Sequence, residues 1–568
     1  MKKLSRKISA CLFLSFFFFT TNAFASNTFA NNTFASNTVA STPPKLVVIF
    51  IVDQFAYHYL DKIEPFLTGG IRFMLDNGIT YENAYMPHAH PATGSGHVAF
   101  NTGCYAKDHG IVGNKWFSKQ GKSIRLTDGI TSKNKVFDRH GQLYDYDASG
   151  ENILVDGISD QLILDSQPNK KNKVFSLSYK DRAAVGMAGK LGKAIWFEKK
   201  KRHFTTSKAY FEKLPEWVKA FNEKHLFPKT PPELVWHTMH PQKKLAYDFY
   251  NATNYNVTSH DFSLINKPFK SITTVNPDGN LYKELFIKTP HANQILLDLS
   301  KECLEHNFSK SDKGTFVLWV GLTPLDPLGH YYGPDSKEAI DMLYHLDWQL
   351  KHFFKYLNKK VDSKDLLLAL SADHGVMPIP ENLQRIGLSN AHRLDQNKLI
   401  KEINKLIEKK FKLKDIVWGY KNGYFYLNKP IFYNLNKTEQ NKILEKLKIY
   451  LKKQQGVQEV WTQTDIQKLQ AEPGSIDSYF KNQLYPARSG ELTCKLVPYA
   501  AITKHKTGTN HRTPYEYDTH IPLMLYQKKS IQKKKIYEKV TALQFANTLA
   551  KICQTQKPAA SKEDVLPI

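Results

Sequence analysis

Four short apolar segments of the chain have the pattern of buried β-strands. Residues 46–52 form a continuous apolar run rich in β-branched side chains, and residues 315–320 and 366–370 have the same character. Residues 523–525 are a shorter candidate. Because strands that are covered on both faces show no alternation of polar and apolar positions, these segments predict a mostly parallel sheet.

Helical periodicity appears between these segments. Residues 335–357 carry apolar side chains at helical spacing, and Asp335 with Glu338 predicts a capping box at the start of that helix. Residues 399–411 predict a second helix. Strands that alternate with helices favour an α/β fold, so we predict a three-layer sandwich with a mostly parallel central sheet and inserted cap segments.

The first 25 residues have the features of a secretory signal peptide. Four basic residues lie within positions 2–7, residues 8–19 are apolar, and Ala23 and Ala25 supply the small residues of a cleavage site. The apolar stretch is shorter than the roughly 20 residues that span a bilayer. We therefore expect cleavage before Ser26, export to the periplasm or beyond, and no transmembrane anchor in the mature chain.

The rest of the chain divides by composition. Residues 26–44 repeat a degenerate five-residue unit without charge, which predicts a disordered leader. A single folded domain is expected over residues 45–555, followed by a tail over residues 556–568. Two stretches of this domain, at about 194–290 and 376–500, are polar and rich in Lys and Tyr. We interpret these two stretches as insertions or a cap.

The composition is that of a globular protein with a strongly basic charge balance. The 568 residues are 41% hydrophobic and 23% charged, which excludes collagen-like and low-complexity classes. Removal of the four basic residues of the signal peptide lowers the formal net charge from +26 to +22, which favours phosphate-bearing substrates, polyanions or anionic membrane surfaces. In an oxidising compartment the remaining cysteines permit two disulfides in any of three pairings. They are Cys104, Cys303, Cys494 and Cys553.

Metal-ligand side chains follow the apolar segments where the predicted strands end. Ligands of open α/β sheets bind at the carboxyl ends of the strands, and Asp with His supplies the oxygen and nitrogen donors that suit zinc. A single Asp or His there is more often a cap or a turn former, but several strand ends that carry them together need another explanation. Six ligands are enough for two zinc ions. The candidates are Asp53, Asp326, His330, Asp373, His374 and His511.

A hydroxyl nucleophile is predicted at Thr93, in a small-residue loop before a predicted helix, with Ser95 as a second hydroxyl two residues away. Backbone N–H groups at a helix start bind phosphate, and coordination to zinc lowers the pKa of a threonine hydroxyl enough for attack. The structural alternative is an ordinary helix N-cap, a position that Thr and Ser favour. The chain has no G-x-S-x-G motif, which argues against a serine hydrolase.

These residues occur within seven motifs in a fixed order. The motifs are VDQF, TGSGH with NTG, HGIVGNKW, SYKDRAAV, LDPLGHYYGP, SADHG and TNHRTPYEYDTHIPLML. Together they resemble the alkaline phosphatase superfamily, in particular its periplasmic, phosphate-irrepressible (PafA-type) alkaline phosphatases, which are related to the nucleotide pyrophosphatases/phosphodiesterases. The resemblance runs from Val47 to about Tyr526 and is weakest in the two insertions.

The resemblance implies an alkaline phosphatase-like fold with two bound Zn²⁺ ions. It also implies that a threonine bridges to one of these ions and acts as the nucleophile. The implied ligands are Asp326, His330 and His511 for one ion, and Asp53, Asp373 and His374, with Thr93 bridging, for the other.

Three further matches concern the transferred phosphoryl group. Asn114, Lys180 and Arg182 match the residues that bind its oxygens in the family. Members with Lys and Arg in the KDR element hydrolyse monoesters, whereas the diesterase branch lacks them, and an Arg fork suits the doubly charged monoester. The resemblance thus implies zinc-dependent hydrolysis of small phosphate monoesters through a phosphothreonine intermediate. The chain departs from the family at Arg512, where relatives commonly have Gly.

Two other functions stay open on the sequence. One is a phosphodiesterase or nucleotide pyrophosphatase of the same superfamily. The other is a non-catalytic, basic surface protein that binds polyanions, for which the net charge and the Lys-rich residues 401–414 and 528–535 are the support. A sulfatase is disfavoured, because no Cys/Ser-x-Pro-x-Arg sequence is present. We expect no obligate nucleic-acid partner, and the sequence does not predict an oligomeric state.

Overall fold

The computed structural model describes residues 42–226, 235–247, 265 and 285–568, which belong to one compact unit spanning residues 39–568. The predicted signal peptide, and the predicted leader up to residue 41, lie outside the described residues. Within the part that is described, no helix is both long enough and apolar enough to cross a membrane.

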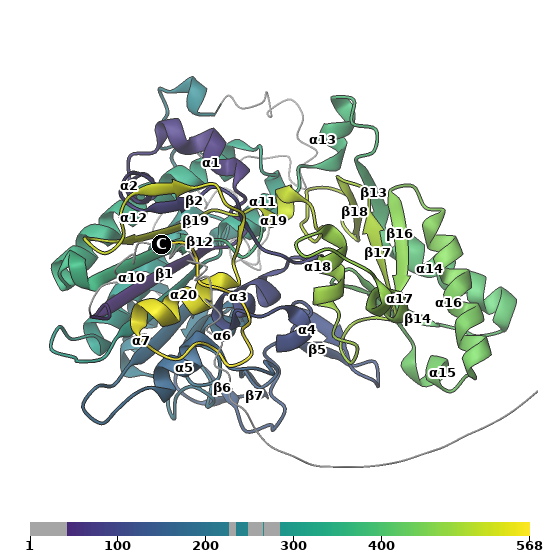
Figure 1. The fold of residues 1–568 in the computed structure, drawn as a ribbon, viewed down its shortest axis with the longest axis horizontal. Helices are drawn as coiled ribbons and strands as arrows, with labels where there is room; N and C mark the ends of the chain where they lie inside the picture. The colour runs from purple at the N-terminus through teal and green to yellow at the C-terminus, as the bar shows by residue number, and fades with distance from the viewer. Residues whose placement is uncertain (1–41, 227–234, 248–264, 266–284) are drawn as a thin grey trace, which may run out of the picture. The chain divides into compact units, whose positions relative to one another are not determined.

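A nine-stranded sheet forms the centre of this unit (Figure 1). Its five neighbouring strands β9, β8, β11, β1 and β12 run parallel, whereas β10 and β19 pair antiparallel with their neighbours. In spatial order the strands are β10 (His203–Thr205), β9 (Lys193–Glu198), β8 (Lys173–Ser178), β11 (Phe316–Leu322), β1 (Leu46–Val52), β12 (Leu366–Ser371), β19 (Leu523–Gln527), β2 (Ile79–Tyr81) and β20 (Lys534–Ile536).

Helices cover both faces of the sheet, as the side chains of two neighbouring strands show. Phe50 of β1 packs on Phe353 of α12. Trp319 of β11 lies opposite Ile49, so it points to the other face, where it contacts Phe545 of α20. The first face carries α2 (Gly70–Asn77), α10 (Pro290–Asn307) and α12 (Lys337–Lys360), and the second carries α3 (Thr93–Thr102), α5 (Ile158–Leu164), α6 (Asp181–Ala188) and α20 (Gln544–Cys553).

The hydrophobic pattern predicts the three central strands well. The apolar run 46–52 is β1 without any shift, and the runs 315–320 and 366–370 are β11 and β12 to within two residues. All residues of these three strands are buried, as expected of strands between two helical layers. The α/β fold with a mostly parallel central sheet is therefore confirmed.

The predicted capping box of the long helix is wrong by one residue. Helix α12 begins after Ser336, whose side chain accepts a hydrogen bond of 3.1 Å from Ala339 N–H. Asp335 instead binds Lys62 Nζ at 2.5 Å. Asp and Ser are both good N-cap residues, so the sequence alone does not choose between neighbours, and the contact with Lys62 from another helix decides.

A second hydrophobic core lies within residues 394–502, which fall largely in the stretch interpreted as the second insertion (Figure 1, green). Helix α14 (Gln396–Phe411), predicted over residues 399–411, and α16 (Lys437–Lys452) pack on a four-stranded antiparallel sheet. The strands and shorter elements here are β13 (His392–Asp395), β14 (Val417–Lys421), β15 (Tyr424–Leu427), α15 (Lys429–Tyr433), β16 (Val457–Thr462), α17 (Gln463–Lys468), α18 (Ile476–Gln483), β17 (Leu492–Leu496) and β18 (Ala500–Thr503).

The interpretation of residues 194–290 as an insertion is wrong at its start. Strands β9 and β10 belong to the central sheet, where β9 pairs with β8 and β10 closes the edge. Composition averaged over a hundred residues hides two short strands when the following residues are polar. Residues 227–234, 248–264 and 266–284 of this stretch lie outside the described residues.

The four cysteines of the folded unit are buried free thiols, so none of the three pairings is present among the described residues. They lie in different parts of the fold; for example, Cys303 lies in α10 and Cys494 in β17. The remaining α-helices and β-strands of the described residues are α1 (His58–Ile63), β3 (Ala84–Tyr85), α4 (Ala106–His109), β4 (Lys115–Phe117), β5 (Ser123–Arg125), β6 (Lys135–Phe137), β7 (Leu143–Asp147), α7 (Glu216–Leu226), α11 (Leu325–Tyr332), α13 (Pro380–Arg385), α19 (Glu516–Thr519) and β21 (Val540–Thr541).

Candidate active site

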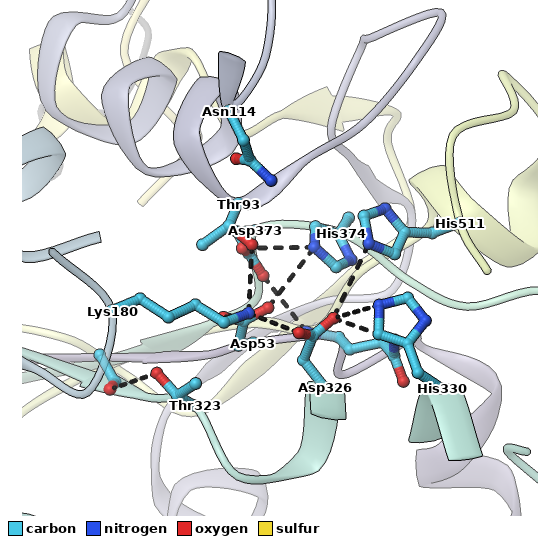
Figure 2. Close-up of polar contacts among 12 residues, drawn as sticks. Asp53, Thr93, Asn114, Lys180, Thr323, Asp326, His330, Asp373, His374 and His511 are labelled. Atoms are coloured by element: carbon cyan, nitrogen blue, oxygen red, sulfur yellow. Dashed lines mark hydrogen bonds and ion pairs between the residues drawn. The ribbon is translucent and has the colours of Figure 1, made fainter. Parts of the chain in front are cut away.

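The carboxyl ends of the parallel strands bring the predicted site residues together (Figure 2). Asp53 directly follows β1, and Asp373 and His374 follow β12. Asp326 and His330 lie four residues apart on α11, the helix that comes after β11, so they share one face of that helix. Segments more than 300 residues apart in sequence therefore meet at one edge of the sheet.

Two groups of carboxylates and imidazoles at this edge have the geometry of metal sites. In each group the ligand atoms lie within 4.8 Å of one another. The groups are adjacent, because the rings of His374 and His511 stack with centroids 3.6 Å apart. The groups are Asp326, His330 and His511, and Asp53, Asp373 and His374, the same sets that the resemblance implies.

Backbone carbonyl groups orient the three histidine rings of these groups. Each ring donates its Nδ1–H to a carbonyl oxygen, which directs Nε2 to the carboxylates, and this is how metal-binding histidines are usually held. Burial lowers the pKa of His374, and it lowers that of His511 well below its usual value, so both rings are neutral ligands. The acceptors are Thr509 O for His330 (2.9 Å), Gly375 O for His374 (3.0 Å) and Pro91 O for His511 (2.8 Å).

Two buried acceptor atoms show that a cation fits this site. Asp53 Oδ1 and His374 Nε2 lie 3.5 Å apart, are buried, and form no hydrogen bond. A carboxylate oxygen and the unprotonated nitrogen of a neutral imidazole do not satisfy each other, and both bind a divalent cation. The mixed oxygen and nitrogen donors of the two groups suit zinc.

Lys180 connects the two groups to the candidate nucleophile. Its Nζ lies 2.6 Å from Asp53 Oδ2 in one group, 2.5 Å from Asp326 Oδ2 in the other, and 3.2 Å from Thr93 Oγ1. The lysine side chain is only 3% exposed, so these charges interact with little screening by water.

The buried carboxylates respond to this arrangement in opposite ways. Burial, followed by the negative charge of Asp373, raises the pKa of Asp53 well above its usual value. Burial also acts on Asp326, but its interactions with Lys180 and His330 outweigh it and hold the pKa of Asp326 well below its usual value.

The structure separates the two candidate hydroxyl groups. Thr93 is the first residue of α3 and Ala92 is its N-cap, so the reading of Thr93 as an ordinary N-cap is wrong. The Ser95 hydroxyl donates to Ala92 O at 3.2 Å, which engages it with the backbone. The Thr93 hydroxyl instead faces Lys180, while the Thr93 carbonyl accepts a hydrogen bond of 2.9 Å from His97 Nδ1.

Asn114 and Arg182 face the same cavity as Thr93 and Lys180, a hollow of about 740 Å³. Asn114 Oδ1 accepts a hydrogen bond of 2.7 Å from Gly94 N–H, so the NH₂ group of this side chain remains to donate toward the cavity. Arg182 Nε is buried and forms no hydrogen bond. Both side chains thus offer donors to an anion beside Thr93.

Gln54 is a site residue to which the sequence analysis assigns no role. Its backbone N–H donates to Asp373 Oδ1 (3.2 Å) and its Nε2 donates to Asp326 Oδ1 (3.1 Å), so it ties the two groups together. A side chain at Gly329 would place Cβ 1.9 Å from Gln54 Oε1, which explains the glycine in the LDPLGH motif. The only sequence signal is the position of Gln54 directly after Asp53.

A buried carboxyl anchors the loop that follows His511. Thr513 N–H and the Thr513 hydroxyl each donate to Asp518 Oδ2 at 2.8 Å. Burial raises the pKa of Asp518 to about 8.

Comparisons with known proteins agree with this geometry. The family model of type I phosphodiesterases/nucleotide pyrophosphatases matches residues 47–520. Alkaline phosphatase PafA of Elizabethkingia meningoseptica is 30% identical over 85% of this chain and 86% of its own length, and alkaline phosphatase PhoV of Synechococcus elongatus is 27% identical over 91% of each chain. The crystal structure of wild-type PafA superposes with a TM-score of 0.78 at 25% identity, covering 93% of this chain and 99% of that one.

Fold and site together define the class of protein: an enzyme built on an α/β sandwich, with two candidate metal groups at the carboxyl edge of a parallel sheet. More particularly, the chain belongs to the type I phosphodiesterase/nucleotide pyrophosphatase family and, within it, to the alkaline phosphatases of the PafA type.

Replacement of Asp518 by Asn should remove a pH dependence of stability. The pKa of this carboxyl rises from 3.8 to about 8 on folding, so between these values the native state holds a proton that the unfolded state has lost. Asp518 therefore makes its full contribution to the free energy of unfolding below about pH 4. This contribution decreases by about 1 kcal/mol per pH unit as the pH rises to about 8. Asn cannot titrate and keeps an acceptor for Thr513.

The measurement is the melting temperature of both proteins at several pH values. We expect the melting temperature of the variant to rise steadily relative to that of the wild type between about pH 5 and about pH 8, since all other groups titrate equally in the two proteins. A constant difference across this range would contradict the assignment.

Proposed function

We propose that the enzyme hydrolyses phosphate monoesters in a zinc-dependent reaction, with Thr93 as the nucleophile. One observation carries the proposal: the buried Lys180 ammonium contacts the Thr93 hydroxyl and a carboxylate from each candidate metal group. A hydroxyl in this place lies beside a buried cation that links both candidate metal groups. The relatives named alkaline phosphatases support the same activity.

Two zinc ions would be held by the two groups, one by Asp326, His330 and His511, the other by Asp53, Asp373 and His374. When bound, they would supply positive charge to the reacting oxygens and lower the pKa of a coordinated hydroxyl or water.

The chain's own residues hold and orient the substrate. The Asn114 amide and the Arg182 guanidinium donate to the oxygens of the transferred phosphoryl group, and Lys180 places its charge beside Thr93. Thr93 Oγ bonds to phosphorus as the ester bond opposite it breaks, and the alcohol leaves toward the cavity. Water then hydrolyses the phosphothreonine, which releases inorganic phosphate and restores the hydroxyl. Position and charge account for the catalysis, as expected for phosphoryl transfer.

The sequence supports three further parts of the proposal. Residues 1–25 are proposed to direct export to a periplasm or the medium, and residues 45–555 to act as a single catalytic domain with inserted cap segments. The substrates are proposed to be small phosphate monoesters, because a doubly charged terminal phosphate uses both Lys180 and Arg182.

The deciding experiment compares kcat/KM for an aryl phosphate monoester and the matching diester, with the protein zinc-loaded and after chelation. We expect a preference for the monoester by orders of magnitude, lost on chelation and restored by zinc. A preference for the diester would leave the assignment of the site unchanged and would assign the enzyme to the diesterase branch of its family. No turnover of either ester with zinc restored would overturn the proposal in favour of a binding protein.

Thr93→Ala should lower kcat for the monoester by about 10³-fold or more, because it removes the nucleophile. Ser95→Ala is the matched control, since within the described residues the Ser95 hydroxyl bonds only to the backbone carbonyl of Ala92. We expect this control to retain most of the activity. Rapid quenching with labelled monoester should trap phosphate on the wild type and not on Thr93→Ala. A near-normal rate for Thr93→Ala would exclude it as the nucleophile.

Combined Lys180→Ala and Arg182→Ala substitutions should lower kcat/KM for the monoester by about 10²-fold or more. The diester has one fewer charged oxygen for these cations, so its loss should stay within about tenfold. Parallel assays of both esters on the same preparations measure the two losses. Equal losses on the two esters would show that these residues do not determine the preference.

A further inference from the structure

Arg512 directly follows the candidate ligand His511 and has an unusual backbone conformation. Its φ is 108°, a region that favours glycine and that L side chains rarely adopt. The Arg512 carbonyl accepts a hydrogen bond of 3.0 Å from His90 Nδ1, and Thr513 N–H on the other side is held by Asp518. The surrounding structure therefore imposes this conformation on a residue with a large side chain.

Among the described residues, the Arg512 side chain has no ion-pair partner. Its Nε is buried without a hydrogen bond, and no carboxylate in the described part of the chain lies within ion-pair distance of its guanidinium. The group lines the cavity together with Arg182, whose Nε is also buried and unbonded. Burial, and the nearby charge of Arg182, lower the pKa of Arg512. Two guanidinium groups with unbonded Nε atoms at one cavity provide donors for an anionic ligand.

The cavity carries more positive charge than one phosphate monoester requires. Nine Lys and Arg residues line it, against two Asp residues. The proposed function assigns only two of these cations to the transferred phosphoryl group, and a volume of about 740 Å³ leaves room for a larger substrate.

We propose that Arg512 binds a second phosphate group, carried by the leaving group, so that the preferred substrates are phosphate monoesters bearing another phosphate. This inference rests on the proposed function. Arg512 directly follows His511, a member of the group of Asp326, His330 and His511, and it lines the same cavity as Thr93 and Lys180. A guanidinium fork binds phosphate oxygens in pairs, which gives selectivity for a second phosphate over a neutral alcohol group.

The test uses the zinc-loaded protein with butane-1,4-diol bisphosphate and butane-1,4-diol monophosphate. The readout is kcat/KM for the bisphosphate divided by kcat/KM for the monophosphate. Because the bisphosphate has two equivalent phosphate groups, this ratio is about two without any preference. We expect a ratio of at least about tenfold in the wild type, in the range of a charge-assisted hydrogen bond. In Arg512→Gly the ratio should fall to about the statistical factor.

Glycine is the informative replacement because it adopts a φ of 108° without strain. We therefore expect Arg512→Gly to melt at a higher temperature than the wild type. With that result, a lost preference for the bisphosphate cannot be attributed to misfolding. Lys504→Ala is the matched control, because it removes one positive charge from an exposed side chain of the same cavity. We expect this control to change the ratio by less than about twofold.

Each other outcome overturns the inference in a recognisable way. Equal losses on both substrates in Arg512→Gly would place Arg512 at the transferred phosphoryl group. An equal fall of the ratio in Lys504→Ala would show a general effect of charge. Turnover of the monophosphate without preference for the bisphosphate would overturn this inference and leave the proposed function standing. Turnover of neither substrate would overturn both.

Discussion

The site depends on the burial of three carboxylates beside one ammonium group. Asp53, Asp326 and Asp373 are almost inaccessible to water, and transfer of an unpaired carboxylate from water into a protein interior costs several kcal/mol. Lys180 compensates two of them directly. The pKa of Asp53 nevertheless stays raised, because burial and Asp373 outweigh the lysine. The charge of this pocket is therefore incompletely balanced by the chain, which is the electrostatic condition for binding metal cations.

The sheet makes this concentration of charge possible. Strands β11, β1 and β12 are adjacent, parallel and buried along their whole length, so their polar residues can occur only at their ends. The register aligns these ends, which brings Asp53 and Asp373 to one edge from distant parts of the chain. The apolar strands stabilise the fold and hold the carboxylates in place. This rigid support matters because an unpaired cluster of acids on a loop would move apart.

The sequence predicts features that depend on local pattern, and it fails where a distant contact decides. The strand at residues 46–52 follows from a hydrophobic run. The two sets of aspartate and histidine residues follow from the ordered motifs. The N-cap of α12 does not, because Asp335 and Ser336 are equivalent until Lys62 engages one of them. The role of Gln54 is not predicted by the sequence, because an amide side chain has no metal-binding or nucleophilic signature. Its role arises from contacts with two segments that approach it only in the folded chain.

At two positions of this site, a residue with positive φ directly follows a candidate metal ligand. Gln54 follows the candidate ligand Asp53 with φ 70°, and Arg512 follows the candidate ligand His511 with φ 108°. In extended backbone, successive side chains point to opposite sides, so a residue next to a ligand would normally point away from the site. A positive φ changes this direction: Gln54 reaches Asp326, and Arg512 lines the cavity together with His511. At both positions a glycine would avoid the conformational strain. Each position instead has a residue whose side chain is directed at the site. Strain of this kind persists where neighbouring contacts fix the backbone, which here are the hydrogen bonds to Asp373 and from His90.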